Sequence, residues 1–166
     1  WPSTLLAQLG SHDGVVLAGP RTGSKTEEFS IPVPLPPNLP GVDVTVARVE
    51  SLPPGLEVPL AGGGRVMRWR EDLEGAAEAA ITTEDGEAVL VREGRRAYLG
   101  GWPDADGWDR VIGRVAGMAG LEVEELPEGL RLRDTASWRF AFNYAPEPLT
   151  YGDMTLQPGE VRWWPR

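Results

Sequence analysis

The stretch VVLAGPRTGSKTEEF, residues 15–29, decides how this chain is interpreted. A short apolar run leads into a loop with Gly19, Lys25 and Thr26, the order found in the phosphate-binding P-loop, G-x-x-x-x-G-K-[ST]. Ser24, however, stands where the second glycine of that pattern belongs. A P-loop must also open a helix, because its anion site uses the free N–H groups of a helix N-terminus. The proline-rich segment that follows excludes a helix, so we expect a loop that holds no phosphate.

The composition is that of an acidic globular chain. Its 166 residues are 41% hydrophobic, which is enough for one domain or two small ones. There are 16 basic and 25 acidic residues, a net charge of −9, and no basic run that could follow a phosphate backbone. Nucleic acid is therefore not an expected partner. The absence of cysteine excludes disulfides, thiolate metal sites and cysteine nucleophiles, and it suits a reducing compartment.

No segment predicts contact with a membrane. The chain lacks an apolar run of the roughly 18 residues that a span needs, and it lacks a charged-then-apolar leader. We therefore expect a cytoplasmic protein without a membrane partner. Because the chain starts at Trp1 rather than at methionine, we also expect an original N-terminus, with or without a leader, to be missing.

The first half of the chain predicts a helix and two kinds of strand. Residues 3–9 have the pattern of an amphipathic helix, closed by Gly10 as a left-handed cap. Residues 14–19 form a continuous apolar run, which is typical of a strand buried on both faces of a parallel sheet. The alternation of Val42, Val44 and Val46 predicts an exposed or edge strand within a proline-rich excursion.

A hairpin and a helix follow. Ala88–Val91 and Ala97–Leu99 are predicted strands, joined by a turn at Glu93-Gly94. Asp104 is a predicted helix cap and Gly120 the predicted helix end. The apolar positions between them have helical spacing: Trp108, Val111, Ile112, Val115 and Met118.

From Leu121 the apolar period changes to two. Four short strands are predicted, in the segments GLRLRD, SWRFAFNY, LTYGDMTL and EVRWW. The second of them places four aromatic residues on one face: Trp138, Phe140, Phe142 and Tyr144. We therefore predict two domains, an α/β domain over residues 1–120 and a small all-β antiparallel domain over residues 121–166.

No motif predicts catalysis, a metal or a cofactor. The acidic triplet Glu71, Asp72 and Glu74 is interpreted as a solvated face, because acids are frequent in this chain. His12 is the single histidine and lies in a turn, so no histidine pair can hold zinc. A nucleophilic Ser24 would need His12 as its base, and it lacks the G-x-S-x-G elbow. We expect neither catalytic residues nor a cofactor.

The tryptophans are weighed separately, because planar aromatic rings stack on sugars as well as fill cores. Trp102, Trp163 and Trp164 are weak candidates for sugar stacking. One of the adjacent pair, Trp163 and Trp164, must face outward if their strand is regular. For any single tryptophan, core packing is the preferred interpretation.

The loop of the opening stretch resembles one in the middle domain of the family 42 glycoside hydrolases, which are bacterial β-galactosidases. The family's loop has the form G-x-R-[ST]-G-x-K-[ST], matched here by Gly19, Arg21, Gly23, Lys25 and Thr26. Further matches follow in the family's order: VTVARVESLPPG, REGRRAYLGGWPD, LPEGLRLR and WRFAFNYAPEP. The resemblance covers nearly the whole chain. It implies that the loop is structural and lies in a domain tied to trimer formation.

The resemblance also implies a fold and an absence of catalysis. The family's middle domain has a fold like the class I glutamine amidotransferases, a flavodoxin-like α/β sheet, and this chain resembles its second half. The family's catalytic glutamates lie in a (β/α)₈ barrel, which needs about 200 residues or more. The acid/base glutamate there follows an asparagine, but neither Asn38 nor Asn143 precedes a glutamate. No catalytic residue is carried over to this chain.

Three functions remain open. The preferred one is a non-catalytic C-terminal portion of a β-galactosidase that supports oligomerisation, with the N-terminal barrel and further copies, a trimer by resemblance, as partners. Galactosides would then be substrates of the parent enzyme only. The alternative is a stand-alone carbohydrate-binding or assembly module that uses exposed tryptophans. A degenerate enzyme is the third, and it needs a deep pocket lined by two carboxylates of residues 20–59. The incomplete sheet is expected to leave a bare edge at residues 15–17.

Overall fold

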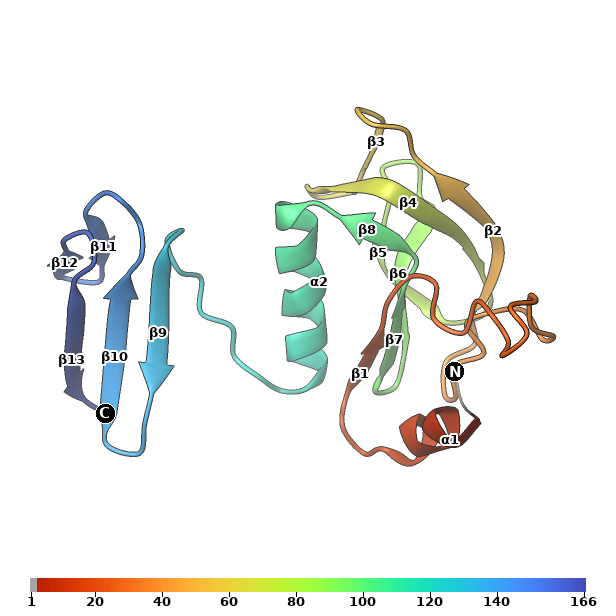
Figure 1. The fold of residues 1–166 in the computed structure, drawn as a ribbon, viewed down its shortest axis with the longest axis horizontal. Helices are drawn as coiled ribbons and strands as arrows, with labels where there is room; N and C mark the ends of the chain where they lie inside the picture. Colours follow the sequence, from red (N-terminus) through yellow and green to blue (C-terminus); the bar gives the residue numbers. More distant parts are fainter. Residues whose placement is uncertain (1–2) are drawn as a thin grey trace. The chain divides into compact units, whose positions relative to one another are not determined.

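The computed structural model describes residues 3–166 (Figure 1). The chain forms two compact units, Trp1–Glu122 and Val123–Arg166. The described elements of the first unit are α1 (Ser3–Ser11), β1 (Val16–Ala18), β2 (Thr45–Ser51), β3 (Glu57–Pro59), β4 (Arg65–Glu74), β5 (Glu78–Thr82), β6 (Ala88–Glu93), β7 (Arg96–Leu99), β8 (Gly101–Pro103) and α2 (Ala105–Met118). Neither helix has the length and apolar character of a membrane span.

Two small sheets make up most of the first unit. One has the order β1-β7-β6-β5, in which β1 and β7 are parallel and the other neighbours are antiparallel. In the other, β4 pairs with β2, β3 and β8, always antiparallel. The described part of this unit is thus mostly β, and it does not show the helices on both faces that an α/β sheet would have. The proline-rich connection between β1 and β2 is one reason, because it cannot form a crossover helix.

Strand β1 lies at the edge of its sheet and pairs with β7 alone. The predicted bare edge is therefore confirmed. The prediction that this strand is buried on both faces is wrong, since Val16 and Leu17 are only half-buried and Ala18 alone is buried. An edge strand has no neighbour on one side, and its side chains gain less cover.

Helix α1 ends differently from the prediction. It continues through Gly10 to Ser11, so Gly10 is not a left-handed cap. The carbonyls at this end meet the guanidinium of Arg96, which is 8% exposed and belongs to β7. Its Nη2 donates to the carbonyls of Leu9, at 2.9 Å, and His12, at 2.5 Å. A cation is favourable there because the last carbonyls of a helix carry partial negative charge.

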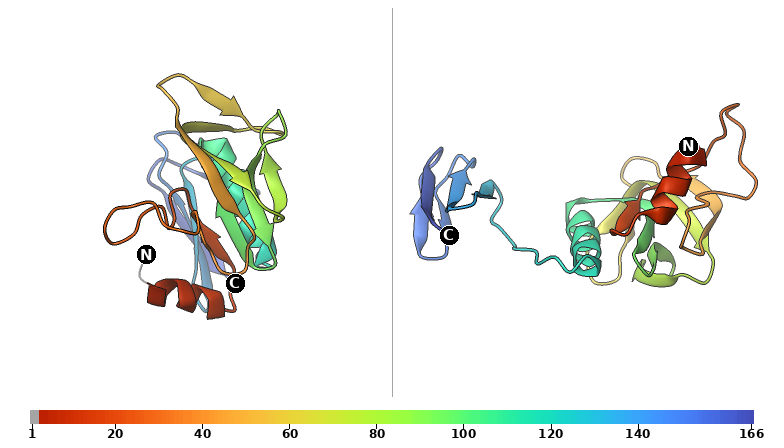
Figure 2. Two further views of the ribbon diagram at one scale, coloured as in Figure 1. Left: turned by 90° about the vertical axis from the view of Figure 1, so that its right-hand side faces the viewer. Right: turned by 90° about the horizontal axis from the view of Figure 1, so that it is seen from below.

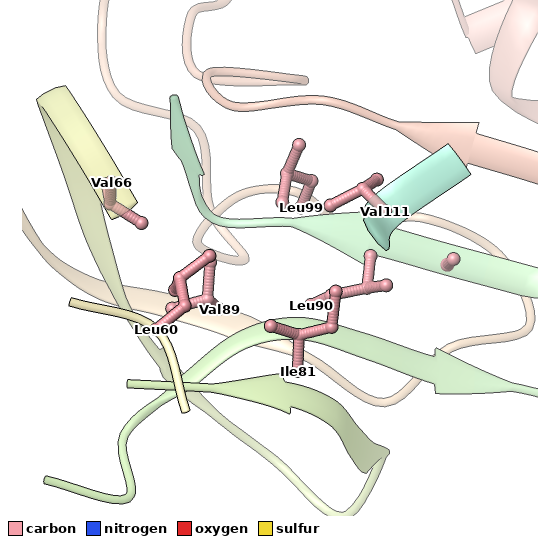
Figure 3. Packing of buried hydrophobic residues seen from close by; sticks show 8 residues of the cluster. Leu60, Val66, Ile81, Val89, Leu90, Leu99 and Val111 are labelled. Atoms are coloured by element: carbon pink, nitrogen blue, oxygen red, sulfur yellow. The ribbon is translucent and has the colours of Figure 1, made fainter. Parts of the chain in front are cut away.

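Helix α2 confirms its prediction. The Asp104 side chain accepts from the N–H of Gly107 at 2.9 Å, and Gly120 follows the helix with a φ of +68°. Val111 faces the sheets and is buried in the main core, which Figure 3 shows. The buried members of that core are Leu60, Val66, Ile81, Val89, Leu90, Ala97, Leu99 and Val111.

The hairpin β6–β7 is confirmed, with its turn one residue later than predicted. Glu93 pairs with Arg96, so the turn residues are Gly94 and Arg95. The strand predicted over the alternating valines is confirmed in part: β2 begins at Thr45 and lies at the end of its sheet, so Val46 belongs to it and Val42 and Val44 precede it. These three valines are not exposed but buried in a second core, together with Tyr98.

The second unit is a small antiparallel β domain with five strands instead of the four predicted. Its strands are β9 (Leu130–Asp134), β10 (Trp138–Asn143), β11 (Leu149–Tyr151), β12 (Met154–Leu156) and β13 (Val161–Pro165). Strands β13, β10 and β9 form one sheet, and β11 and β12 form a hairpin. The segment predicted as one strand turns at Gly152, whose φ is +55°. Leu130, Ala141 and Leu156 are the buried core of this unit.

The aromatic row of β10 lies on the face of its sheet opposite that core. Phe140 stacks with Phe142 at 6.3 Å between ring centroids, and Phe142 stacks with Tyr144 at 6.1 Å. Trp138 and Tyr144 are exposed. The prediction of a shared face is therefore confirmed, although the row is only partly buried within this unit.

Candidate functional site

The loop of residues 19–26, called here the 19–26 loop, follows directly after β1. It turns twice and then continues as an irregular segment, and there is no helix between Ala18 and Thr45, all of which the structure describes. The loop amides therefore do not belong to a helix N-terminus, which a P-loop requires. The side chain of Lys25 is exposed.

A buried carboxylate lies beneath this loop. Glu71 is on β4 and is 2% exposed, so its interpretation as part of a solvated acidic face is wrong. Residues Trp69, Glu71 and Leu73 alternate along the strand, and this period of two turns Glu71 inward together with its apolar neighbours. Asp72 is half-buried and Glu74 is exposed.

Three donors meet the Glu71 carboxylate. The backbone N–H of Arg21 and the indole N–H of Trp69 both donate to Oε1, each at 2.9 Å. The hydroxyl of Tyr98, which is fully buried on β7, donates to Oε2 at 2.5 Å. An ionised carboxylate only accepts, and hydrogen bonds to it are stronger than those between neutral groups. Glu71 therefore ties the 19–26 loop to β4 and β7.

The environment of Tyr98 keeps its hydroxyl protonated. Burial first, and the hydrogen bond to Glu71 second, raise the pKa of this hydroxyl well above its ordinary value. The proton therefore stays on Tyr98, and the hydroxyl remains a donor to Glu71.

Arg21 has an unusual backbone conformation. Its φ is +67°, in the left-handed region that side chains other than glycine rarely adopt. The bond from its N–H to Glu71 holds that conformation, and its guanidinium lies over the Trp69 ring at 5.2 Å from the centroid. Such a cation–π contact contributes about 0.5–1 kcal/mol at an exposed site. Loop and strand are thus joined by the backbone and by the side chain of one residue.

The other loop residues continue this anchoring. Thr22 is buried, and its hydroxyl donates to the carbonyl of Gly19 at 2.8 Å. Gly23 has a φ of +64°, and a Cβ there would lie 2.7 Å from the carbonyl oxygen of Pro37. The hydroxyl of Thr26 bonds that of Ser30 at 2.8 Å and closes the next turn. The structure thus joins Gly19, Arg21, Gly23 and Thr26 into one packed loop, with Lys25 on its outside.

A pocket of about 300 Å³ lies between this loop and β2. Its apolar walls include Ile31, Leu35 and Val49, and its cations are Arg21, Lys25 and Arg48. Glu71 is the one carboxylate in its lining, and no acid of residues 20–59 lines it. The pocket therefore lacks the pair of carboxylates that the degenerate-enzyme hypothesis needs.

A serine nucleophile is equally unsupported. Ser24 lines this pocket, whereas His12 lines a different one beside Arg96. Without a base in reach, a serine hydroxyl is a weak nucleophile. Within residues 3–166 there is also no cluster of three His, Asp or Glu side chains that could hold a metal ion.

The three candidate tryptophans have different surroundings. Trp102 is 48% exposed and meets the ring of Trp108 edge-on, with centroids 6.2 Å apart. Trp163 is 61% exposed and lies beside Phe140. Trp164 packs against the core of the second unit, and its ring is tilted by 33° to that of Tyr151, with centroids 6.3 Å apart. Trp163 and Trp164 thus face opposite sides of the sheet, as a regular strand requires. Sugar stacking remains a prediction for the exposed rings of Trp102 and Trp163.

Sequence reasoning missed Glu71, Trp69 and Tyr98 as a site. A signal was present, because a glutamate between two large apolar residues at a period of two is an unusual feature of a strand. The position of Tyr98 at the middle of the second hairpin strand could also have suggested a buried hydroxyl that needs a partner.

Known proteins that resemble this chain are much longer. A curated β-galactosidase of Thermus thermophilus is 50% identical over 145 residues, which are 82% of this chain and 22% of that protein. The β-galactosidase BgaA of a Thermus species is 48% identical over 145 residues, with the same two shares. No family model matches the chain. The chain thus spans 22% of the length of these curated relatives.

Solved structures extend the comparison to the whole fold. The β-galactosidase from the psychrophilic Marinomonas ef1 matches 100% of this chain and 27% of its own, with a TM-score of 0.89 and 33% identity. Gan42B, a GH42 β-galactosidase from G. stearothermophilus, matches 98% of this chain and 29% of its own at a TM-score of 0.72. Its identity of 14% shows a likeness of fold only.

Proposed function

Because this chain is homologous to part of the β-galactosidases of glycoside hydrolase family 42, we propose that it is a non-catalytic portion of such an enzyme that supports its assembly. The parent enzyme would hydrolyse terminal β-D-galactosides with retention of configuration, at a site outside this chain. The partners of the chain are then a catalytic barrel and further copies of itself, with galactoside bound only through the parent enzyme.

One observation supports this proposal above the others. The carboxylate beneath the family's loop, Glu71, is buried and occupied by three donors, and it is the single carboxylate in the lining of the pocket between that loop and β2. A retaining glycosidase needs two carboxyl groups about 5–5.5 Å apart that face the substrate. Glu71 is instead bonded like a structural anchor, so the loop is better explained as scaffold than as an active site.

The two units are assigned to different domains of the parent enzyme. We propose that residues 1–120 are the later half of the middle domain, related to the amidotransferase-like fold, and that they carry the assembly role. Residues 121–166 are then the small C-terminal β domain. The bare edge of β1 and the exposed apolar side chains of the first unit support this assignment, because both need cover from another segment.

A chromogenic galactoside tests the proposal. We expect the purified chain to hydrolyse it no faster than buffer does, because the pocket beside the 19–26 loop has a single carboxylate and three donors already occupy it. A full-length family member is the positive control under the same conditions. Saturable turnover by this chain would contradict the proposal, most clearly if the Glu71→Gln variant abolished it.

The exposed rings of Trp102 and Trp163 favour one second candidate, a carbohydrate-binding module. Calorimetric titration with galactose and with lactose separates the two functions. A structural portion gives no heat of binding with either sugar. A saturable heat that disappears in Trp163→Ala, and persists in a Trp164→Phe control, would support the binding module instead.

A further inference from the structure

The three-stranded sheet of the second unit has two apolar faces, and one of them has no cover within that unit. On the covered face, Leu130 and Ala141 form the core together with Leu156 of the hairpin β11–β12. The other face carries the aromatic row of β10. In Figures 1 and 2 the strands of this sheet run side by side at the C-terminal end of the chain. Contiguous exposed apolar side chains typically mark an interaction site.

Strand pairing defines the uncovered face. Phe140 pairs with Trp163 of β13 on one side and with Arg133 of β9 on the other, and directly paired residues point to the same face of a sheet. Tyr144 is 72% exposed and Trp163 61%. We call this face the aromatic face, and its residues on the three strands are Trp138, Phe140, Phe142, Tyr144, Val161, Trp163, Arg131 and Arg133.

The rings of the aromatic face are already ordered. The planes of Phe140 and Phe142 differ by 21°, those of Phe142 and Tyr144 by 19°, and the ring of Trp163 lies 6.4 Å from that of Phe140. Side chains held in one arrangement lose little entropy when a partner covers them. Aromatic side chains also bury a large area each, and they are enriched among the residues that dominate binding energies.

The arginines of the face indicate the chemistry of the partner. Within residues 3–166, neither Arg131 nor Arg133 takes part in an ion pair. Nearby acids are paired with other arginines, since Asp134 binds Arg139 at 2.8 Å. A partner that presents carboxylates beside apolar side chains would therefore complement both the rings and the two guanidinium groups.

The size of the related proteins indicates where this partner lies. The chain spans 22% of the length of the curated relatives, so most of the parent enzyme is outside it. A partner in the same polypeptide meets the face at an effective concentration on the order of millimolar. A separate molecule would have to reach that concentration in solution. The rest of the parent enzyme is therefore the favoured occupant.

We propose that the aromatic face docks onto the catalytic part of the parent enzyme, on a patch of apolar side chains bordered by carboxylates. This inference rests on the proposed function and names the surface by which the second unit joins the rest of the enzyme. The aromatic rings supply buried area, and Arg131 and Arg133 fix the orientation through pairs with carboxylates.

Thiol labelling tests the inference in a fusion that carries this chain in place of the matching part of the Thermus thermophilus β-galactosidase. Tyr144→Cys adds a thiol to a chain that has no cysteine of its own. We expect a maleimide to react at position 144 at least tenfold more slowly in the fusion than in the 166-residue chain, because an interface core excludes the reagent. Asp153→Cys is the matched control, since Asp153 is exposed on the turn of the hairpin β11–β12, and its rate should be the same in both proteins.

A second pair of variants tests the charge of the partner. Arg133→Glu in the fusion should raise the labelling rate at position 144 at least threefold, because it places a carboxylate against the carboxylates of the docked surface. Arg114→Glu, at an exposed position of α2, should leave that rate unchanged. Equal rates in the two variants would contradict the role of the arginines.

The possible results separate the aromatic face from the proposed function. A fusion that does not hydrolyse a galactoside would overturn the proposed function, because this chain could not replace the matching part of a β-galactosidase. An active fusion that is labelled at position 144 as fast as the 166-residue chain would overturn the docking and leave the proposed function standing. Slow labelling of the 166-residue chain that dilution relieves would also overturn the docking, since a second copy would then cover the face.

Discussion

Replacement of Glu71 by alanine lowers the free energy of unfolding of the first unit by about 3–5 kcal/mol. The reason is that three donors lose their acceptor at once: the N–H of Arg21, the indole N–H of Trp69 and the hydroxyl of Tyr98. Each buried donor left without a partner costs about 1–3 kcal/mol, and the costs are not additive within one network. The midpoint of urea unfolding measures the change, provided that the slope stays constant.

Two further variants show whether the loss of stability comes from the Glu71 carboxylate itself. Glu74→Ala removes an exposed glutamate from the same strand and should change stability by about 0.5 kcal/mol or less. Glu71→Gln keeps one oxygen acceptor but adds two N–H donors, so its loss should lie between the other two. If Glu71→Ala were no more destabilising than Glu74→Ala, the carboxylate would not be the anchor of the loop.

Gly23→Ala is expected to destabilise the first unit by about 2–4 kcal/mol. Two costs combine: the left-handed conformation, which costs about 1–2 kcal/mol for a residue with a Cβ, and contact of that Cβ with a carbonyl. The contact is severe because the Cβ would lie 2.7 Å from the backbone oxygen of Pro37, which cannot move independently of the chain. Urea unfolding again measures the change.

Gly55→Ala separates these two costs. Gly55 also has a positive φ, +86°, but a Cβ there would meet nothing within 4 Å. Gly55→Ala therefore has the conformational cost alone. The loss in the free energy of unfolding should be larger for Gly23→Ala than for Gly55→Ala by about 1–3 kcal/mol. Equal losses in the two variants would mean that the loop does not pack against Pro37 as described.

Local signals in the sequence were sufficient for the second helix and for both hairpin strands. Asp104 and Gly120 bound α2 because a carboxylate cap and a left-handed glycine act within one turn of the chain. The end of α1 could not be predicted in this way. Its carbonyls are met by Arg96, which is far away in sequence, and local composition carries no information on that contact.

Burial was the hardest property to predict. Glu71 belongs to an acidic triplet that looks solvated, yet the period of β4 turns it inward beside Trp69 and Leu73. The opposite error occurred at β1, where a continuous apolar run predicted cover on both faces and the strand lies at an edge. The burial of the β1 side chains depends on which segments pack against the strand, and the apolar sequence of the strand does not specify those segments. In the second unit, a Gly-Asp turn within an apolar segment was overlooked, and one predicted strand is two.

The loop residues illustrate what resemblance adds to local reasoning. Composition and prolines were enough to reject a phosphate site after β1. They did not indicate that the N–H of Arg21 binds a carboxylate or that Gly23 lies against Pro37. The resemblance to the β-galactosidases implied a structural loop, and the contacts around Glu71 give that implication a physical basis.

Hydrogen exchange at the backbone amide of Arg21 tests most directly whether the 19–26 loop is scaffold anchored by Glu71. The amide should be protected in the unmodified chain, because its proton is held by a buried carboxylate at 2.9 Å. We expect protection to fall at least tenfold in Glu71→Gln and to stay unchanged in Glu74→Ala. An Arg21 amide that exchanges in the unmodified chain as fast as in an unfolded peptide would contradict the account.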